Sequence, residues 1–166
     1  YANKINLISN EIKDVCIEKG IEPENPLNKG QLLDHLMSNL VEPKLIEPTF
    51  IIDYPKVISP LAKTHRGNRG NLVERFELFI GGSEFANSFS ELNDPIDQRK
   101  RFEEQARFKA GGDVEAQPID TQFIEAMECG MPPTGGVGIG IDRLTMLLTE
   151  NRWIKDVILF PILKSE

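Results

Sequence analysis

The sequence predicts an α+β fold in which an antiparallel β-sheet is flanked by helices. Residues 74–90 alternate apolar and polar side chains on both sides of Gly81-Gly82-Ser83, which is typical of a β-hairpin. Residues 135–141 alternate glycine with aliphatic residues, and a period of two is that of a strand. The helical periodicity of the segments around these strands predicts the flanking helices.

Two helices are expected before the sheet. Residues 3–19 carry apolar side chains at helical spacing, and Gly20 can end that helix. Residues 21–27 contain two prolines and are predicted to form a linker. A second helix is expected from about residue 29 to residue 41, because its apolar stripe continues until Pro43 stops it.

The remaining elements follow from local signals. Residues 49–54 are rich in strand-forming side chains and predict a short strand. Asp94-Pro95 opens a helix that runs to about residue 110 and whose charged side chains, Arg101 among them, are expected to face solvent. Asp120 begins a further helix. Residues 157–161 form a last apolar segment that is expected to be buried.

Residues 63–71 form a polar, basic loop within an acidic chain. One interpretation is a solvated, mobile loop. The other is a lid that meets phosphate or RNA when substrate is bound. The sequence does not decide between them.

Composition excludes several classes of function. The chain has 166 residues, enough for one domain with a core, and its net charge of −7 argues against a general electrostatic clamp for nucleic acid. Cys16 and Cys129 lie far apart without metal-binding spacing, so we expect two buried free thiols in a reducing compartment. No signal peptide or membrane-spanning run is visible, which predicts a cytoplasmic protein without membrane contact.

The predicted hairpin carries a cluster of polar groups on one face. A three-residue loop would pair Glu77 with Asn87 and place both on the face of Glu91. Two carboxylates and an amide form a site for a cation, either a metal or an ammonium. Simple alternation leaves Glu84 on the opposite face, and only a bulge beside the turn would bring it into the site. The alternative is a half-exposed polar face, but aromatic residues share this face and favour a pocket: Phe79, Phe85 and Phe89.

The glycine-rich strand has two different faces. Val137, Ile139 and Ile141 predict an aliphatic core face, whereas the glycines leave bare backbone on the other. Either a flat ligand lies on that backbone, or a tight strand crossing requires small residues there. Asp142 is expected to cap the following helix, and Arg143 lies in its first turn, where the helix dipole disfavours a cation.

A glycine-alternating strand that runs into a helix opening with arginine resembles motif 3 of the class II aminoacyl-tRNA synthetases. Within that class, six segments resemble the lysyl-tRNA synthetase family in order along the chain: residues 45–51, 58–63, 74–79, 89–94, 130–136 and 156–161. The resemblance runs from about residue 28 to the end, and residues 1–27 match loosely. It implies a partial class II catalytic domain, with a helical insertion region at residues 1–44, the C-terminal part of the catalytic domain at 45–166, and motif 3 at 135–149.

The resemblance also implies a chemistry and a set of site residues. The family attaches lysine to tRNA(Lys) with ATP and Mg²⁺, through lysyl-adenylate. Glu77 and Glu84 match its magnesium ligands. Arg143 matches its catalytic arginine, stacked on adenine. The positions that match residues bordering ATP are Glu84, Phe85, Gly140, Ile141 and Asp142. The positions that match the lysine pocket are Asn87, Phe89 and Glu91, and the position of Glu91 is the one that faces the lysine ammonium.

The chain shows no counterpart of motif 1, which builds the family's homodimer, or of motif 2, whose arginine holds the α-phosphate. The anticodon-reading domain is not seen either. We therefore expect the chain alone to be inactive, with an uncovered apolar sheet face that favours self-association. Two alternatives remain open: a related enzyme that attaches lysine to a protein, and a non-catalytic fragment that binds or regulates.

Overall fold

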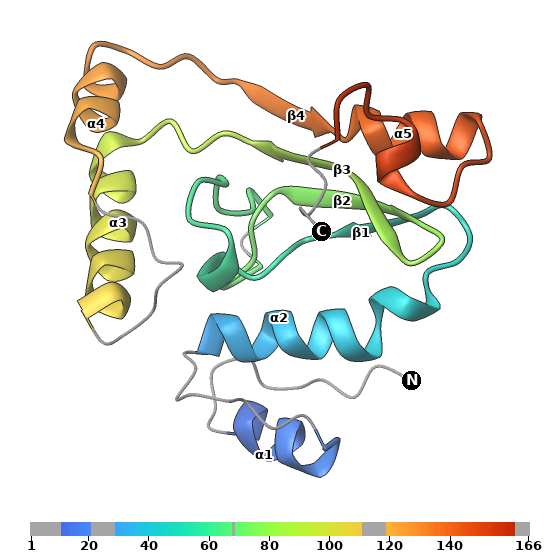
Figure 1. Cartoon of the computed structure of the whole chain (residues 1–166). Helices are drawn as coiled ribbons and strands as arrows, with labels where there is room; N and C mark the ends of the chain where they lie inside the picture. Colours follow the sequence, from blue (N-terminus) through green and yellow to red (C-terminus); the bar gives the residue numbers. More distant parts are fainter. Residues whose placement is uncertain (1–10, 21–28, 68, 111–118, 162–166) are drawn as a thin grey trace.

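The computed structural model of the chain describes residues 11–20, 29–67, 69–110 and 119–161. Its centre is a four-stranded antiparallel sheet in the order β1-β2-β3-β4, which Figure 1 shows with helices at both ends and below it. The strands are β1 (Thr49–Ile52), β2 (Arg75–Ile80), β3 (Ser83–Ser90) and β4 (Gly135–Ile139). The predicted α+β class, with an antiparallel sheet flanked by helices, is confirmed.

The α-helices are α1 (Glu11–Glu18), α2 (Lys29–Leu40), α3 (Pro95–Ala110), α4 (Thr121–Glu128) and α5 (Ile141–Leu148). Three short 3₁₀ turns, η1 (Glu42–Lys44), η2 (Lys56–Ile58) and η3 (Ile154–Asp156), join them to the strands and loops. Figure 1 shows α3 and α4 side by side at one end of the sheet and α5 at the other. The first part of the helix predicted at 3–19 and the linker at 21–27 lie outside the described residues. None of the helices in the described ranges has the length and apolar character needed to span a membrane.

Helices α1 and α2 pack against each other through their predicted apolar stripes. Ile12, Cys16, Leu32 and Leu36 are buried together in this contact. Burial raises the pKa of the Cys16 thiol. Cys129 is exposed, so the prediction of two buried thiols is wrong for it. It follows the last turn of the short helix α4, beyond that helix's buried stripe.

Two predicted helix caps are present. The Asp94 carboxylate accepts hydrogen bonds from the backbone N–H groups of Ile96 and Asp97, at 2.9 and 3.2 Å. The Asp120 carboxylate accepts one from the N–H of Phe123 at 2.9 Å. Each aspartate thereby satisfies amides in the first turn of its helix that have no partner within the helix.

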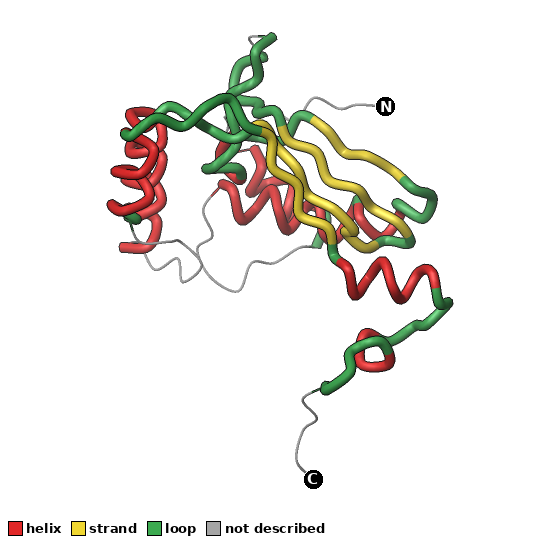
Figure 2. Tube along the Cα trace, turned by 90° about the horizontal axis from the view of Figure 1, so that it is seen from above, coloured by secondary structure: helices red, strands yellow, loops and turns green. Residues whose placement is uncertain are grey.

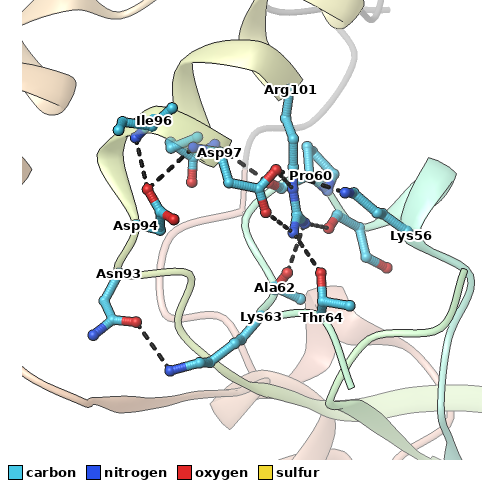
Figure 3. A network of polar contacts seen from close by, with 12 residues as sticks. Lys56, Pro60, Ala62, Lys63, Thr64, Asn93, Asp94, Ile96, Asp97 and Arg101 are labelled. Carbon is cyan, nitrogen blue, oxygen red and sulfur yellow. Dashed lines mark hydrogen bonds and ion pairs between the residues drawn. The ribbon is translucent and has the colours of Figure 1, made fainter. Parts of the chain in front are cut away.

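Arg101 corrects the prediction that the charged residues of α3 face solvent, because it is only 3% exposed. Figure 3 shows its guanidinium inserted between α3 and the segment that follows η2. It donates to the carbonyl oxygen of Ala62 at 2.7 Å, to the Thr64 hydroxyl at 3.1 Å and to the Asp97 carboxylate at 2.7 Å. Helical periodicity could not reveal this, since Ala62 and Thr64 belong to a loop that lies more than thirty residues earlier. The network fastens α3 to the loop that borders the sheet.

Replacing Arg101 by methionine is expected to lower the free energy of unfolding by about 3 kcal/mol, because buried oxygens lose their donors and Asp97 loses its partner. Replacing Lys100, the exposed neighbour on α3, by methionine is the matched control and should change stability by less than about 0.5 kcal/mol. Urea unfolding measures both. Equal stability of the two variants would contradict a structural role for the Arg101 network.

The Arg101 prediction has a pH signature. The hydrogen bonds from Arg101 hold the pKa of Asp97 below its usual range. A lowered pKa in the folded state stabilises the protein above the ordinary aspartate pKa, and this stabilisation is lost as the pH falls through the lowered value. The difference in free energy of unfolding between wild type and Arg101→Met should therefore become smaller only at acidic pH, as Asp97 is protonated.

One face of the sheet is apolar and open. Phe50 and Ile52 on β1 are 60% and 63% exposed, and Val137 and Ile139 on β4 are 65% and 54% exposed. The prediction that the aliphatic row of the glycine-rich strand forms core is therefore wrong for this chain. Alternation correctly assigned these side chains to one face, but nothing in the described ranges covers that face. Ile141 continues the row and is 65% exposed.

The segment after α5 also departs from expectation. Leu159 and Phe160 are 88% and 90% exposed, although residues 157–161 were predicted to be buried. Figure 2 shows α5 and the following chain extending away from the sheet. The apolar character of the segment therefore marks a surface that none of the residues described in the structure covers.

We expect the isolated chain to self-associate through the open sheet face, because apolar patches of this kind and free edge strands favour association. Lysine substitutions at Ile52 and Val137 should shift the chain towards monomer in sedimentation velocity. Ile96→Lys is the matched control, since Ile96 is 68% exposed on α3, away from the sheet. A monomeric wild type, or an equal effect of Ile96→Lys, would contradict the prediction.

Candidate active site

The hairpin of β2 and β3 turns through two residues, Gly81 and Gly82, with φ of 59° and 76°. Ile80 pairs with Ser83, so the three-residue loop expected from sequence is wrong. Glu77 nevertheless pairs with Asn87, as predicted. The register shifts by one residue between Leu78 and Phe79, and this bulge compensates for the shorter turn.

The bulge places Glu84 on the face of Glu77. Glu84 pairs with Phe79, and Phe79 shares its strand face with Glu77. Burial raises the pKa of Glu84, and the negative charge of Glu77 raises it further. The carboxylates of Glu77 and Glu84 are therefore close enough to influence each other's charge. Simple alternation placed Glu84 on the opposite face, and the bulge brings it to the face of Glu77.

Sequence reasoning missed the residues that surround Glu77. The Tyr54 hydroxyl donates to one carboxylate oxygen of Glu77 at 2.6 Å, and the Arg75 guanidinium donates to the other. The Arg75 guanidinium also lies over the Tyr54 ring, 4.7 Å from its centre. Alternation had placed Arg75 on the face of Glu77. The position of Tyr54, however, depends on the pairing of β1 with β2, for which the sequence gives no local signal.

The lysine-pocket candidates lie beside β4. Asn87 pairs with Gly138, and Phe89 pairs with Gly136. A Cβ atom on Gly136 would lie 2.0 Å from the Glu91 carboxylate, so the missing side chain of this glycine makes room for Glu91. Burial raises the pKa of Glu91. The Glu91 carboxylate forms no ion pair or side-chain hydrogen bond within the described residues.

The ATP candidates gather where β4 runs into α5. The Arg143 guanidinium donates to the carbonyl oxygen of Glu84 at 2.5 Å, and the Gly140 N–H donates to the carbonyl oxygen of Phe85 at 2.9 Å. Gly140 is the N-cap of α5 and has no side chain to offer, so the expectation that Asp142 caps the helix is wrong. Asp142 lies inside the first turn. It is exposed, as is Ile141.

Two cavities border these groups. One, of about 160 Å³, is lined by residues of the η2 loop together with Arg75, Asn87 and Phe89. The other, of about 650 Å³, is lined by Phe85, Arg143 and side chains of α5 and η3. The first adjoins the lysine candidates and the second adjoins the ATP candidates. Trp153, 65% exposed, lines the second cavity and is not core.

The basic loop at 63–71 is tied to acidic neighbours at its described positions. The Arg69 guanidinium contacts the Asp53 carboxylate at 2.6 Å, and Nε2 of His65 lies 3.5 Å from the same carboxylate. Arg66 donates to Glu74 at 2.6 Å, which holds the pKa of Glu74 far below its usual range. The Arg66 and Arg69 side chains remain 81% and 59% exposed while they form these ion pairs, so both interpretations of the loop stay open.

Residues 8–164 match the protein family described as tRNA synthetases class II (D, K and N). The chain belongs to this family. The synthetase resemblance of the hairpin and of the strand that enters α5 is thereby confirmed, and the four-stranded antiparallel sheet with flanking helices is a partial class II synthetase domain.

Curated relatives in the class II synthetase family are similar over most of the chain. A lysine–tRNA ligase of Thermosynechococcus vestitus is 63% identical over 137 residues, which cover 82% of this chain and 27% of the relative. A lysine–tRNA ligase of Porphyromonas gingivalis is 54% identical over 94% of this chain and 27% of its own length. One of Azobacteroides pseudotrichonymphae is 51% identical over 99% of this chain and 33% of its own length. The chain thus spans about a quarter to a third of these relatives.

The carboxylates on this face of the sheet suit a divalent cation. Glu77 and Glu84 share one face, and the charge of Glu77 raises the pKa of Glu84, so a cation between them would relieve their repulsion. Magnesium in nucleotide sites takes one or two carboxylates and completes its shell with water and phosphate oxygens. No group of three or more His, Cys, Asp or Glu residues with metal-binding geometry occurs in the described ranges.

Proposed function

We propose that the protein carrying this chain attaches lysine to tRNA(Lys) in two steps, through lysyl-adenylate, with ATP and Mg²⁺. Its close relatives are lysine–tRNA ligases, and the family assignment fits. The assignment of lysine as the substrate rests mainly on the environment of the Glu91 carboxylate. It is partly withdrawn from water over Gly136 and has no cationic partner within the described ranges.

An unpaired, partly buried carboxylate favours a cationic ligand. The ε-ammonium of lysine would supply the missing charge, and a neutral side chain of similar length would leave Glu91 unpaired. Asn87 and Phe89 then complete the lysine pocket, on the strand that carries Glu91 at its end. Phe89 packs against the buried cluster of Tyr54, Ala62 and Val73, which gives that wall of the pocket a fixed position.

ATP is proposed to lie at the other end of β4. Arg143 is exposed apart from its contact with Glu84, so its planar guanidinium can stack on adenine. The bare backbone of Gly138 and Gly140 gives the nucleotide close access to the strand. Phe85, Ile141 and Asp142 border the same end. Glu77 and Glu84 are the proposed magnesium ligands.

The chemistry is an attack of the lysine carboxylate on the α-phosphorus of ATP, with release of pyrophosphate. Magnesium, when bound, neutralises phosphate charge. The residues of this chain contribute by binding and orientation: Glu91 and Asn87 hold lysine, and Arg143, the proposed catalytic residue, fixes the nucleotide. Such positioning accounts for large rate effects without a protein nucleophile.

The division of the chain is part of the proposal. Residues 1–44 form a helical insertion region, and residues 45–166 form the C-terminal part of the catalytic domain, with motif 3 at 135–149. The whole protein is proposed to act as a cytoplasmic homodimer. The expected inactivity of the isolated chain follows from its short span relative to the ligases.

Lysine-dependent exchange of pyrophosphate into ATP tests the proposal in the full-length protein. We expect exchange with lysine and not with aspartate or asparagine, the other amino acids of the family. The isolated chain should give no exchange above background. Exchange driven by another amino acid would overturn the substrate assignment, and wild-type-like exchange by the isolated chain would contradict its predicted inactivity.

A further inference from the structure

Arg75 lies between the two halves of the candidate site and contacts both. Its Nε–H donates to the side-chain oxygen of Asn87 over 3.1 Å, and its Nη2–H donates to the Glu77 carboxylate. We propose that Arg75, together with Tyr54, is a positioning residue that fixes Glu77 for magnesium-bound ATP and Asn87 for lysine. This inference rests on the proposed function and deepens it.

The guanidinium of Arg75 is itself held in place. Its Nη1–H groups donate to the carbonyl oxygen of Ile58 and to the Ser59 hydroxyl, both at 2.9 Å. The side chains of Arg75 and Glu77 are 15% and 12% exposed. A largely buried ion pair adds little net stability, because removing two charges from water is costly. Its fixed fork geometry instead sets the orientation of the groups that it contacts.

For Asn87 the consequence is a choice of amide orientation. A guanidinium carries only donors, so the Asn87 oxygen must face Arg75, and the amide nitrogen is left for other partners. With its oxygen occupied, Asn87 offers N–H donors to a ligand. The matching groups are oxygen acceptors, such as the carboxylate of lysine or a phosphate oxygen of the adenylate.

For Glu77 the consequence is a fixed carboxylate. One oxygen accepts from Arg75 and the other from the Tyr54 hydroxyl at 2.6 Å, so the group cannot rotate freely. Each carboxylate oxygen has room for about two partners, which leaves one position on each for a cation or its bound water. Tyr54 contacts Glu77 and not Asn87, whereas Arg75 contacts both. The two residues can therefore be separated by experiment.

The experiment compares Tyr54→Phe and Arg75→Lys with wild type in the full-length protein. Equilibrium dialysis without lysine gives the Mg²⁺ concentration that half-saturates ATP binding, and calorimetry without ATP gives the lysine Kd. Tyr54→Phe is expected to raise the half-saturating Mg²⁺ concentration about tenfold and to leave the lysine Kd within about twofold of wild type. Arg75→Lys is expected to raise both quantities about tenfold, because a lysine cannot reach both partners at once. Arg99→Lys, at an exposed ion pair with Glu128 away from the candidate site, is the matched control and should change neither.

Three outcomes overturn the inference: wild-type values in both variants, a lysine Kd that rises as much in Tyr54→Phe as the Mg²⁺ requirement, or a loss in Arg99→Lys equal to that in Arg75→Lys. Circular dichroism checks folding, and if Arg75→Lys does not fold, the Mg²⁺ dependence of Tyr54→Phe decides alone. If the wild-type protein binds no lysine, both the proposed function and this inference are wrong. If the wild-type protein binds lysine and both variants behave like it, only this inference is wrong.

Discussion

Replacing Glu91 by glutamine is expected to lower kcat/KM for lysine by about a hundredfold to a thousandfold, because the lysine ammonium would enter a partly dehydrated pocket without its counter-charge. The change keeps the shape of the side chain, so the space over Gly136 remains filled. ATP binding depends on groups at the other end of β4 and should stay within about twofold of wild type. Exchange kinetics at varied lysine, together with equilibrium dialysis of ATP, measure the two effects separately.

The pH dependence of lysine binding gives a second readout for Glu91. The ionised carboxylate is the form that binds an ammonium, and burial raises the pKa of Glu91 above its ordinary value. Lysine affinity, measured without ATP, should therefore begin to fall at a higher pH than an ordinary glutamate would cause, and Glu91→Gln should abolish this dependence. Equal losses of lysine and ATP binding in Glu91→Gln would remove Glu91 from the lysine pocket.

Replacing Gly136 by alanine is expected to weaken lysine use about a hundredfold without unfolding the protein. The new Cβ would lie 2.0 Å from Oε1 of Glu91 and 3.1 Å from its Cδ, so the carboxylate must move. The backbone at Gly136 is extended β-strand, which alanine adopts without strain. The obstacle is the end of a flexible side chain, so the cost falls on the position of Glu91 rather than on the fold.

Gly135→Ala is the matched control for the alanine substitution. A Cβ atom at Gly135 would meet nothing within 4 Å. Steady-state kinetics and thermal unfolding of both variants should show normal melting temperatures and a lysine defect in Gly136→Ala alone. A normal KM for lysine in Gly136→Ala would show that the Glu91 carboxylate is not needed where the structure has it. A defect in Gly135→Ala as well would point to a general effect on the strand.

The strands and most helices could be predicted from sequence because their signals are local. The caps at Asp94 and Asp120 and the period of two in residues 135–139 each depend on a few neighbouring residues. The pairing of Glu77 with Asn87 was correct although the turn was assigned one residue too many, because the bulge added one residue to β3. No local sequence pattern predicts this bulge. It could be expected only because Glu84 matches a family site residue and could not otherwise lie on the face of Glu77.

The errors concern which surfaces are covered, and this depends on distant parts of the chain. Arg101 was expected in water because its helical neighbours are charged, yet its acceptors come from the loop at 59–64. Val137 and Phe160 were expected in a core because they are apolar, yet no described residue covers them and they are 65% and 90% exposed. Tyr54 was not considered for the site because its contact with Glu77 spans 23 residues. The resemblance supplied the proposed site residues, but it did not supply Tyr54 and Arg75, which contact Glu77 in the structure.

The hairpin turn has a consequence for how the site can move. The N–H groups of Gly81 and Gly82 donate to the carbonyl oxygens of Ile46 and Leu45, at 2.8 and 2.9 Å. A hairpin tip is ordinarily the freest part of a sheet, but this one is tethered to the chain that leaves α2. Glu84 lies two residues beyond the tether. Any displacement of the hairpin that carries Glu84 must therefore strain or break these two hydrogen bonds, so the segment that leaves α2 restrains the end of the site where we propose that magnesium binds.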